Sequence, residues 1–76
     1  MRKRQSHRKE MTRLGVMIKK HLLDRGMEHR EFARKLGMSP MYLSKIIYGY
    51  RPPGEYTEAL AKELGIDPEV VKILAA

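Results

Sequence analysis

The chain has 76 residues, no cysteine and a formal net charge of +7. This length allows one small domain held together by packing alone, because disulfides and thiolate metal sites both need cysteine. No apolar run approaches the roughly 20 residues that span a bilayer, and no signal-like apolar segment follows the basic start, so we expect a soluble, cytoplasmic protein with no membrane partner.

The charge is unevenly distributed along the chain. Residues 1–53 carry 14 basic and 4 acidic side chains, whereas residues 54–76 carry 2 basic and 5 acidic ones. This polarity indicates one face that meets a polyanion and one end that does not. A basic protein that is merely well solvated is the plainer alternative.

Residues 1–9 are predicted to be a flexible basic arm, ahead of a folded domain over residues 10–76, because the arm lacks apolar residues after Met1. Two interpretations of the arm stay open. It enters a minor groove or wraps a duplex, or it is a solubilising tail. Its cationic side chains are Arg2, Lys3, Arg4, Arg8 and Lys9.

An amphipathic helix is predicted from about Glu10 to Arg25, where apolar residues repeat at spacings of three and four. Gly26 ends it in a left-handed conformation. Gly15 costs up to about 1 kcal/mol relative to alanine within a helix, which indicates close contact with a neighbour. His21 falls on the apolar side, and we expect a packed, hydrogen-bonded histidine because no partner at metal-ligand spacing is visible. The repeating apolar residues are Met11, Leu14, Ile18 and Leu22.

Two short helices follow, and only a short turn separates them. The first runs from about His29 to Leu36 and ends at a glycine. The second, over about residues 40–48, starts after Ser39, a good N-cap. Pro40 suits its first position, where the missing N–H costs nothing. The predicted inward-facing residues are Phe32, Ala33 and Leu36 in the first helix and Leu43, Ile46 and Ile47 in the second.

The last third of the chain predicts two more helices. The prolines in "YRPPGE" exclude helix, so a loop is expected there. A helix from about Glu55 to Leu64 follows, with Leu60, Ala61 and Leu64 inward. The "DPE" at residues 67–69 then opens a final helix with a side-chain cap, a proline and an acid. Since strand signals are absent, the predicted fold class is all-α with five short helices.

Because the helix over about residues 40–48 begins so soon after the preceding helix ends, the two helices must cross steeply. This is the helix-turn-helix arrangement. Its second helix fits the major groove, which is about 12 Å wide. At 100° per residue, the side chains that face away from the core are Met41, Ser44, Lys45 and Tyr48, with Tyr42 on the flank.

These side chains have chemistry that suits DNA. Lys45 can donate to guanine, Met41 can contact a thymine methyl, and Ser44 can reach a base or a sugar. Tyr42 and Tyr48 suit phosphate or sugar contacts better. Outward-facing Arg30 and Arg34, and the free N–H groups at the start of their helix, can bind phosphates.

From about Leu14 to Leu74 the sequence also resembles the phage-repressor-like, Cro/C1-type helix-turn-helix family. The resemblance is carried, in order, by "LGVMIKKHLLDRG", "EFARKLGMSPMYLSKIIYG" and "LAKELGID". In this family residues like Ala33, Gly37, Ser39 and Gly49 recur at these offsets. The resemblance implies a five-helix, lambda-repressor-like domain.

The same resemblance implies roles for single residues. It implies that Met41 and Lys45 read bases, that Pro40 also contacts a base, and that Arg51 contacts a phosphate. It places Ser39, Tyr42 and Ser44 close to the backbone or base edges. All expected base-reading residues are therefore Pro40, Met41, Ser44 and Lys45, and all expected backbone contacts are His29, Arg30, Arg34, Ser39, Tyr42, Tyr48 and Arg51.

Three departures from the family pattern are visible. His29 stands where the family often has a glutamine that buttresses the recognition helix or grips a phosphate. Glu28 stands in place of the usual Ser or Thr cap and is a weaker cap. The base-reading positions hold few side chains that can form two hydrogen bonds to one base. We therefore expect more of the sequence specificity to come from the arm and from DNA shape.

The final helix carries apolar residues around most of its circumference, more than one small core can absorb. We favour a homodimer formed through this end, as relatives often form, and packing within the core alone is the alternative. The expected dimer-interface residues are Val70, Val71, Ile73 and Leu74.

An enzyme is not expected, because the chain has no cysteine, no glycine-rich phosphate loop and no paired carboxylates on a buried surface. No metal, cofactor or small-molecule effector is expected either. The predicted function is a sequence-preferring, double-stranded-DNA-binding transcriptional regulator of prokaryotic or phage type, such as a repressor. The alternative is a protein-interaction module, such as an antitoxin or bridging factor. RNA binding ranks third, because no aromatic platform for stacked bases is visible.

Overall fold

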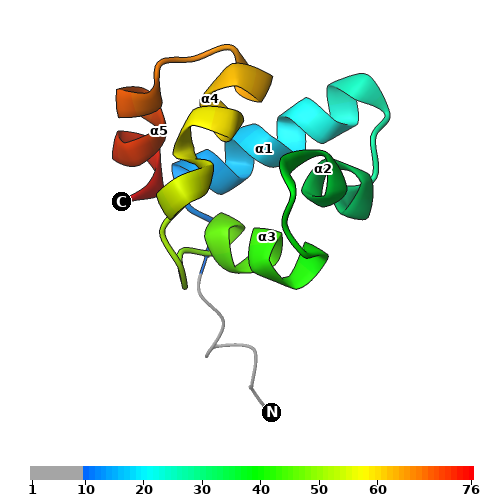
Figure 1. The fold of residues 1–76 in the computed structure, drawn as a ribbon, viewed down its shortest axis with the longest axis horizontal. Coiled ribbons are helices and arrows are strands. Elements are labelled where there is room, and N and C mark those ends of the chain that lie inside the picture. The colour runs from blue at the N-terminus through cyan, green and yellow to red at the C-terminus, as the bar shows by residue number, and fades with distance from the viewer. Residues whose placement is uncertain (1–9) are drawn as a thin grey trace.

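A computed structural model describes residues 10–76 of the chain (Figure 1). The all-α fold class is confirmed, with no strand among these residues. Within them, no helix is both long and apolar enough to cross a membrane. The predicted arm, residues 1–9, lies outside the described part of the chain. The helices are α1 (Arg13–Arg25), α2 (His29–Leu36), α3 (Pro40–Ile47), α4 (Thr57–Leu64) and α5 (Pro68–Ala75), and the 3-10 helix η2 (Gly54–Tyr56) precedes α4.

The start of α1 differs from the prediction. The side-chain oxygen of Thr12 accepts a hydrogen bond from the Gly15 N–H (2.9 Å), so α1 begins at Arg13 and not at Glu10. This is an ordinary threonine N-cap. Met11, which the periodicity placed on the buried stripe, therefore precedes the helix and is exposed.

The other boundaries lie close to the predicted ones. The predicted caps are present: Ser39 Oγ accepts from the Tyr42 N–H (3.1 Å) and the Asp67 carboxylate from the Glu69 N–H (3.1 Å). Helix α3 ends at Ile47, one residue earlier than predicted. The predicted fourth helix is split, because its first residues form η2, a tighter turn of the kind that often precedes an α-helix.

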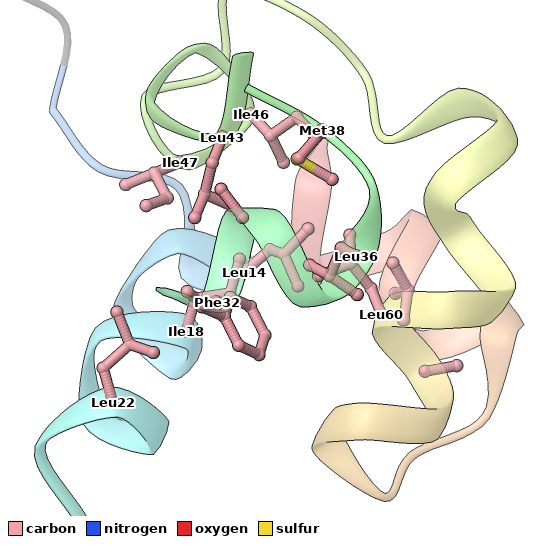
Figure 2. Close-up of a cluster of buried hydrophobic side chains, with 13 residues drawn as sticks. Leu14, Ile18, Leu22, Phe32, Leu36, Met38, Leu43, Ile46, Ile47 and Leu60 are labelled. Atoms are coloured by element: carbon pink, nitrogen blue, oxygen red, sulfur yellow. The ribbon is translucent and has the colours of Figure 1, made fainter. Parts of the chain in front are cut away.

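The core lies where the five helices meet, and the side chains of α1, α2 and α3 point toward one another around Phe32 (Figure 2). Phe32 and Leu43 are completely buried, as are most residues that the periodicity placed inward. Leu64 is only half-buried and packs against the edge of this cluster. The fully buried large side chains are Phe32, Leu14, Ile18, Leu43, Ile46, Ile47, Leu60 and Val71.

The N-cap residue of α1 is bonded to the last residue of α3. Both the backbone N–H and the hydroxyl of Thr12 donate to the Ile47 carbonyl oxygen, at 2.9 and 3.1 Å. Gly15 confirms the expected close contact, because a Cβ there would collide with the same oxygen and lie 2.8 Å from Ile47 Cγ2. A side chain at position 15 would therefore push α1 and α3 apart.

His21 is packed and hydrogen-bonded, as expected. Its ring centroid lies 5.4 Å from that of Phe32, and its Nδ1 accepts from the Arg25 Nε–H at 3.4 Å. Nε2 is buried without a partner within the described chain. Burial, aided by the positive charge of Arg25, holds the pKa of His21 below its usual value and so favours the neutral ring. Residues 10–76 contain no cluster of His, Cys, Asp or Glu that could hold a metal ion.

We expect Gly15→Ala to lower the free energy of unfolding by about 1–3 kcal/mol, because overpacking against Ile47 outweighs the gain of about 1 kcal/mol that alanine brings inside a helix. Urea denaturation measures the change. Lys20→Ala, at an exposed position of the same helix, is the control and should shift stability by less than about 0.5 kcal/mol. A more stable Gly15→Ala variant would contradict the close contact.

Candidate nucleic-acid interface

Helices α2 and α3 are joined by a turn of three residues, Gly37, Met38 and Ser39. Gly37 adopts a left-handed backbone (φ 80°), and the Met38 N–H donates to the Ala33 carbonyl at 2.9 Å. The Met38 side chain is buried in the core, as Figure 2 shows. The turn is therefore fixed from inside, and α3 lies along one edge of the domain (Figure 1).

The outward face of α3 brings together four predicted site residues, at positions 41, 44, 45 and 48. They share a face because residues three and four apart are neighbours on a helix. The Met41 side chain is 69% exposed, Lys45 is exposed, and Ser44 and Tyr48 are half-buried. Together with Tyr50 and Arg51 these residues line an open hollow on the surface.

Tyr50 belongs to this surface, although the sequence analysis did not select it. Its side chain is 51% exposed. The backbone N–H groups of Tyr50 and Arg51 both donate to the Lys45 carbonyl, at 2.8 and 3.2 Å, which turns the chain back beside α3. The signal in the sequence was an aromatic residue directly after the glycine that follows the helix.

His29 supports the start of α3. Its Nε2 lies 2.9 Å from the Pro40 carbonyl oxygen and 3.3 Å from Ser44 Oγ. Because a carbonyl oxygen only accepts, Nε2 carries the hydrogen and donates it. This contact ties the first residue of α2 to the first turn of α3. In the neutral ring Nδ1 is then an acceptor, so the predicted phosphate contact needs a hydrogen on Nδ1 as well.

Two tyrosines pack beside the same turn. The Tyr42 ring lies 5.5 Å from the Tyr56 ring, and the Tyr56 hydroxyl donates to the Gly37 carbonyl at 3.4 Å. Tyr42 is half-buried on the flank of α3, as the helical projection predicted, whereas Pro40 is exposed. The Ser39 oxygen caps α3 by accepting a hydrogen bond, so its hydroxyl hydrogen remains to be donated in the predicted phosphate contact.

The predicted cationic contacts of α2, Arg30 and Arg34, are exposed. Arg30 forms an ion pair with Glu28 (3.2 Å), but both side chains are well exposed and such surface pairs contribute little, so Arg30 can exchange it for a phosphate. The Glu28 N–H donates to the Glu31 carboxylate at 3.0 Å, which helps to cap α2 without a Ser or Thr.

A family model described as "Helix-turn-helix" matches residues 18–71, more than half of the chain, and includes α2, the turn and α3. The chain belongs to the Cro/C1-type helix-turn-helix family. This is a family of DNA-binding regulators that are not typically enzymes. No curated protein and no solved structure matches the chain.

In this helix-turn-helix protein the chain enters α1 beside the C-terminal end of α3. Thr12 is bonded to Ile47 at the C-terminal end of α3, so residues 10 and 11 lie near that end of the helix. The attachment point of the predicted arm is therefore near the C-terminal end of α3 (Figure 1). The five cationic arm residues themselves lie outside the described part of the chain.

Helix α5 corrects one predicted dimer residue. Val71 is completely buried in the core, because it faces α1 and α4, so it cannot contact a partner. Ile73 is 64% exposed and Val70 37% exposed, and Leu74 is half-buried. An open groove runs beside α5. It is lined by Arg13, Val16, Met17, Lys20, His21, Asp24, Leu64 and Leu74.

We expect His29→Ala to lower the free energy of unfolding by about 1 kcal/mol, because it removes the bond to the Pro40 carbonyl. DNA affinity should fall as well, since the first turn of α3 is then less firmly held. Chemical denaturation and a DNA titration measure the two effects. His29→Gln, whose amide can donate in the same direction, is the matched variant and should retain more of both. Equal losses in the two variants would contradict this role for His29.

Proposed function

We propose that this helix-turn-helix protein is a sequence-preferring regulator that binds double-stranded DNA with α3 in the major groove. The stripe of Met41, Ser44, Lys45 and Tyr48 on the outward face of α3 carries the proposal. A single helix fills the major groove, and base edges there can be reached by side chains on one helical face. Lys45 is the hydrogen-bond donor to guanine, and Ser44 reaches a neighbouring base or sugar.

Basic and polar groups around α3 supply the phosphate contacts in this proposal. Arg30 and Arg34 lie on α2, which crosses the backbone in this arrangement, and Arg51 follows α3. Tyr42, Tyr48 and Ser39 contribute weaker hydrogen bonds to phosphate or sugar, and His29 does so when both of its ring nitrogens carry a hydrogen. Such contacts set the position and orientation of the protein and leave sequence preference to α3.

The arm adds affinity from the same side of the domain. Its attachment next to Ile47 supports an arm that follows the duplex, in preference to a tail that only aids solubility. Because α3 has few bidentate hydrogen-bonders, part of the sequence preference then comes from the shape of the groove that the arm enters.

We also propose that two copies associate through α5 and the neighbouring groove. Ile73 and Val70 are exposed on α5, and Val16 of α1 is 46% exposed at the wall of the groove. This surface combines exposed aliphatic side chains from two helices, and burying it against a second copy removes them from water. A two-fold dimer would bind two half-sites about one helical turn apart.

Selection of random duplexes by the protein at near-physiological salt tests the DNA proposal. We expect an enriched motif with half-sites about 10 base pairs apart. Lys45→Ala should relax the preference at one position per half-site, whereas Arg51→Ala should weaken binding to all sites alike and reduce the salt slope by about 1. Lys72→Ala on α5 is the charge-matched control. A featureless pool together with a salt-insensitive protein complex would favour the protein-interaction module instead.

Ile73→Asp tests the dimer. We expect a change to monomers in sedimentation equilibrium, because a carboxylate would be buried in the apolar interface. Leu23→Asp is the control, since Leu23 is 81% exposed on α1 and does not line the groove. A wild-type protein that is monomeric both in solution and on a two-half-site duplex would contradict the dimer.

A further inference from the structure

Met41 is the one side chain without a hydrogen-bonding hydroxyl or cationic group among the residues that line the α3 hollow. Met41 stands at one end of the stripe and Tyr48 at the other, and Tyr50 lies beside them in the hollow. Between the two ends are one hydroxyl, on Ser44, and one ammonium, on Lys45. Seven large hydrophobic side chains are exposed in residues 10–76, and two of them, Met41 and Tyr50, line this hollow.

The major groove offers one apolar group to such a face. Among the natural base pairs only A·T presents a methyl group there, at C5 of thymine, while the remaining edge atoms are hydrogen-bond donors and acceptors. A methionine side chain is flexible and polarisable, and it fits irregular apolar surfaces well. The phosphates on either side complement the positive charges of Lys45 and Arg51.

We propose that this face recognises the C5-methyl group of a pyrimidine, and that Met41 makes the contact. The inference rests on the proposed DNA-binding function and specifies what its recognition helix reads. Thymine and 5-methylcytosine carry the methyl group on the same ring carbon, so the protein accepts 5-methylcytosine where it prefers thymine over cytosine. Binding is then sensitive to cytosine C5 methylation within the half-site.

The position of Met41 fits this role. It is the second residue of α3, and the N-terminal residues of a recognition helix contact base edges. The bond from His29 to the Pro40 carbonyl holds this first turn in place. Lys45 is one helical turn further on, about 6 Å along the axis, so its guanine contact falls within about two base pairs of the methyl contact.

The experiment uses the duplex that emerges from the selection. Each thymine is replaced singly by deoxyuridine, which lacks only the methyl group, and the dissociation constant is measured by fluorescence anisotropy at fixed salt. We expect about a fourfold loss of affinity at one thymine per half-site, the effect of leaving one methyl group unburied. At the same position cytosine should bind more weakly than 5-methylcytosine by a similar factor.

Two variants show which residue causes the difference in affinity between the thymine and deoxyuridine duplexes. Met41→Ala should bind the thymine and deoxyuridine duplexes equally well, and its melting temperature should be unchanged because Met41 is 69% exposed. Arg34→Ala, an exposed residue of α2, should weaken both duplexes while it retains the fourfold ratio. The ratio therefore separates loss of the methyl contact from loss of phosphate affinity.

The remaining outcomes are distinguishable. A clear motif with no thymine-to-deoxyuridine difference at any position would overturn the methyl contact and leave the proposed function intact. A difference that persists in Met41→Ala would also overturn it, because it would then arise from DNA shape or another residue. If no duplex binds with sequence preference, the proposed function fails and this inference fails with it.

Discussion

The bond between Thr12 and the Ile47 carbonyl is the constraint on which the rest of the structure depends. The last carbonyls of a helix have no partner within it, and here Thr12 supplies two donors to one of them. The same threonine accepts the Gly15 N–H and so starts α1. One residue thus sets the beginning of α1, the end of α3 and the point where the chain enters the domain. Gly15 allows the two backbones to approach closely enough.

A second hydrogen bond and a buried side chain hold the N-terminal end of α3. His29 donates to the Pro40 carbonyl, and Met38 anchors the intervening turn in the core. Between these ends the inner face of α3 is fixed by Leu43, Ile46 and Ile47, which are almost entirely buried. The helix is therefore held along its length from one side only. A surface that is already ordered loses less conformational entropy on binding, which favours recognition by side chains as few as those of the α3 stripe.

Local signals predicted most of this fold, and long-range contacts account for what the sequence analysis missed. Ser39 and Asp67, each followed by proline, predicted the starts of α3 and α5 because a cap acts within one turn. The apolar period, which Met11 continues, predicts too early a start for α1, because the bond that fixes Thr12 spans 35 residues. The hydrophobic pattern of α5 could not separate buried Val71 from its exposed neighbours, since packing against α1 and α4 decides that.

The charges near each apolar surface indicate which occupant suits it. Lys45 and Arg51 border the α3 hollow, so a protein on that face would have to bury both cations and would need to be acidic to offset the cost. DNA meets this requirement with phosphates, and its methyl groups suit the apolar side chains between them. The groove beside α5 is different, because Arg13 and Lys20 are accompanied by Asp24. Mixed charges of this kind can pair with their own copies across a two-fold axis, which favours a second copy of the chain at α5 and a polyanion at α3.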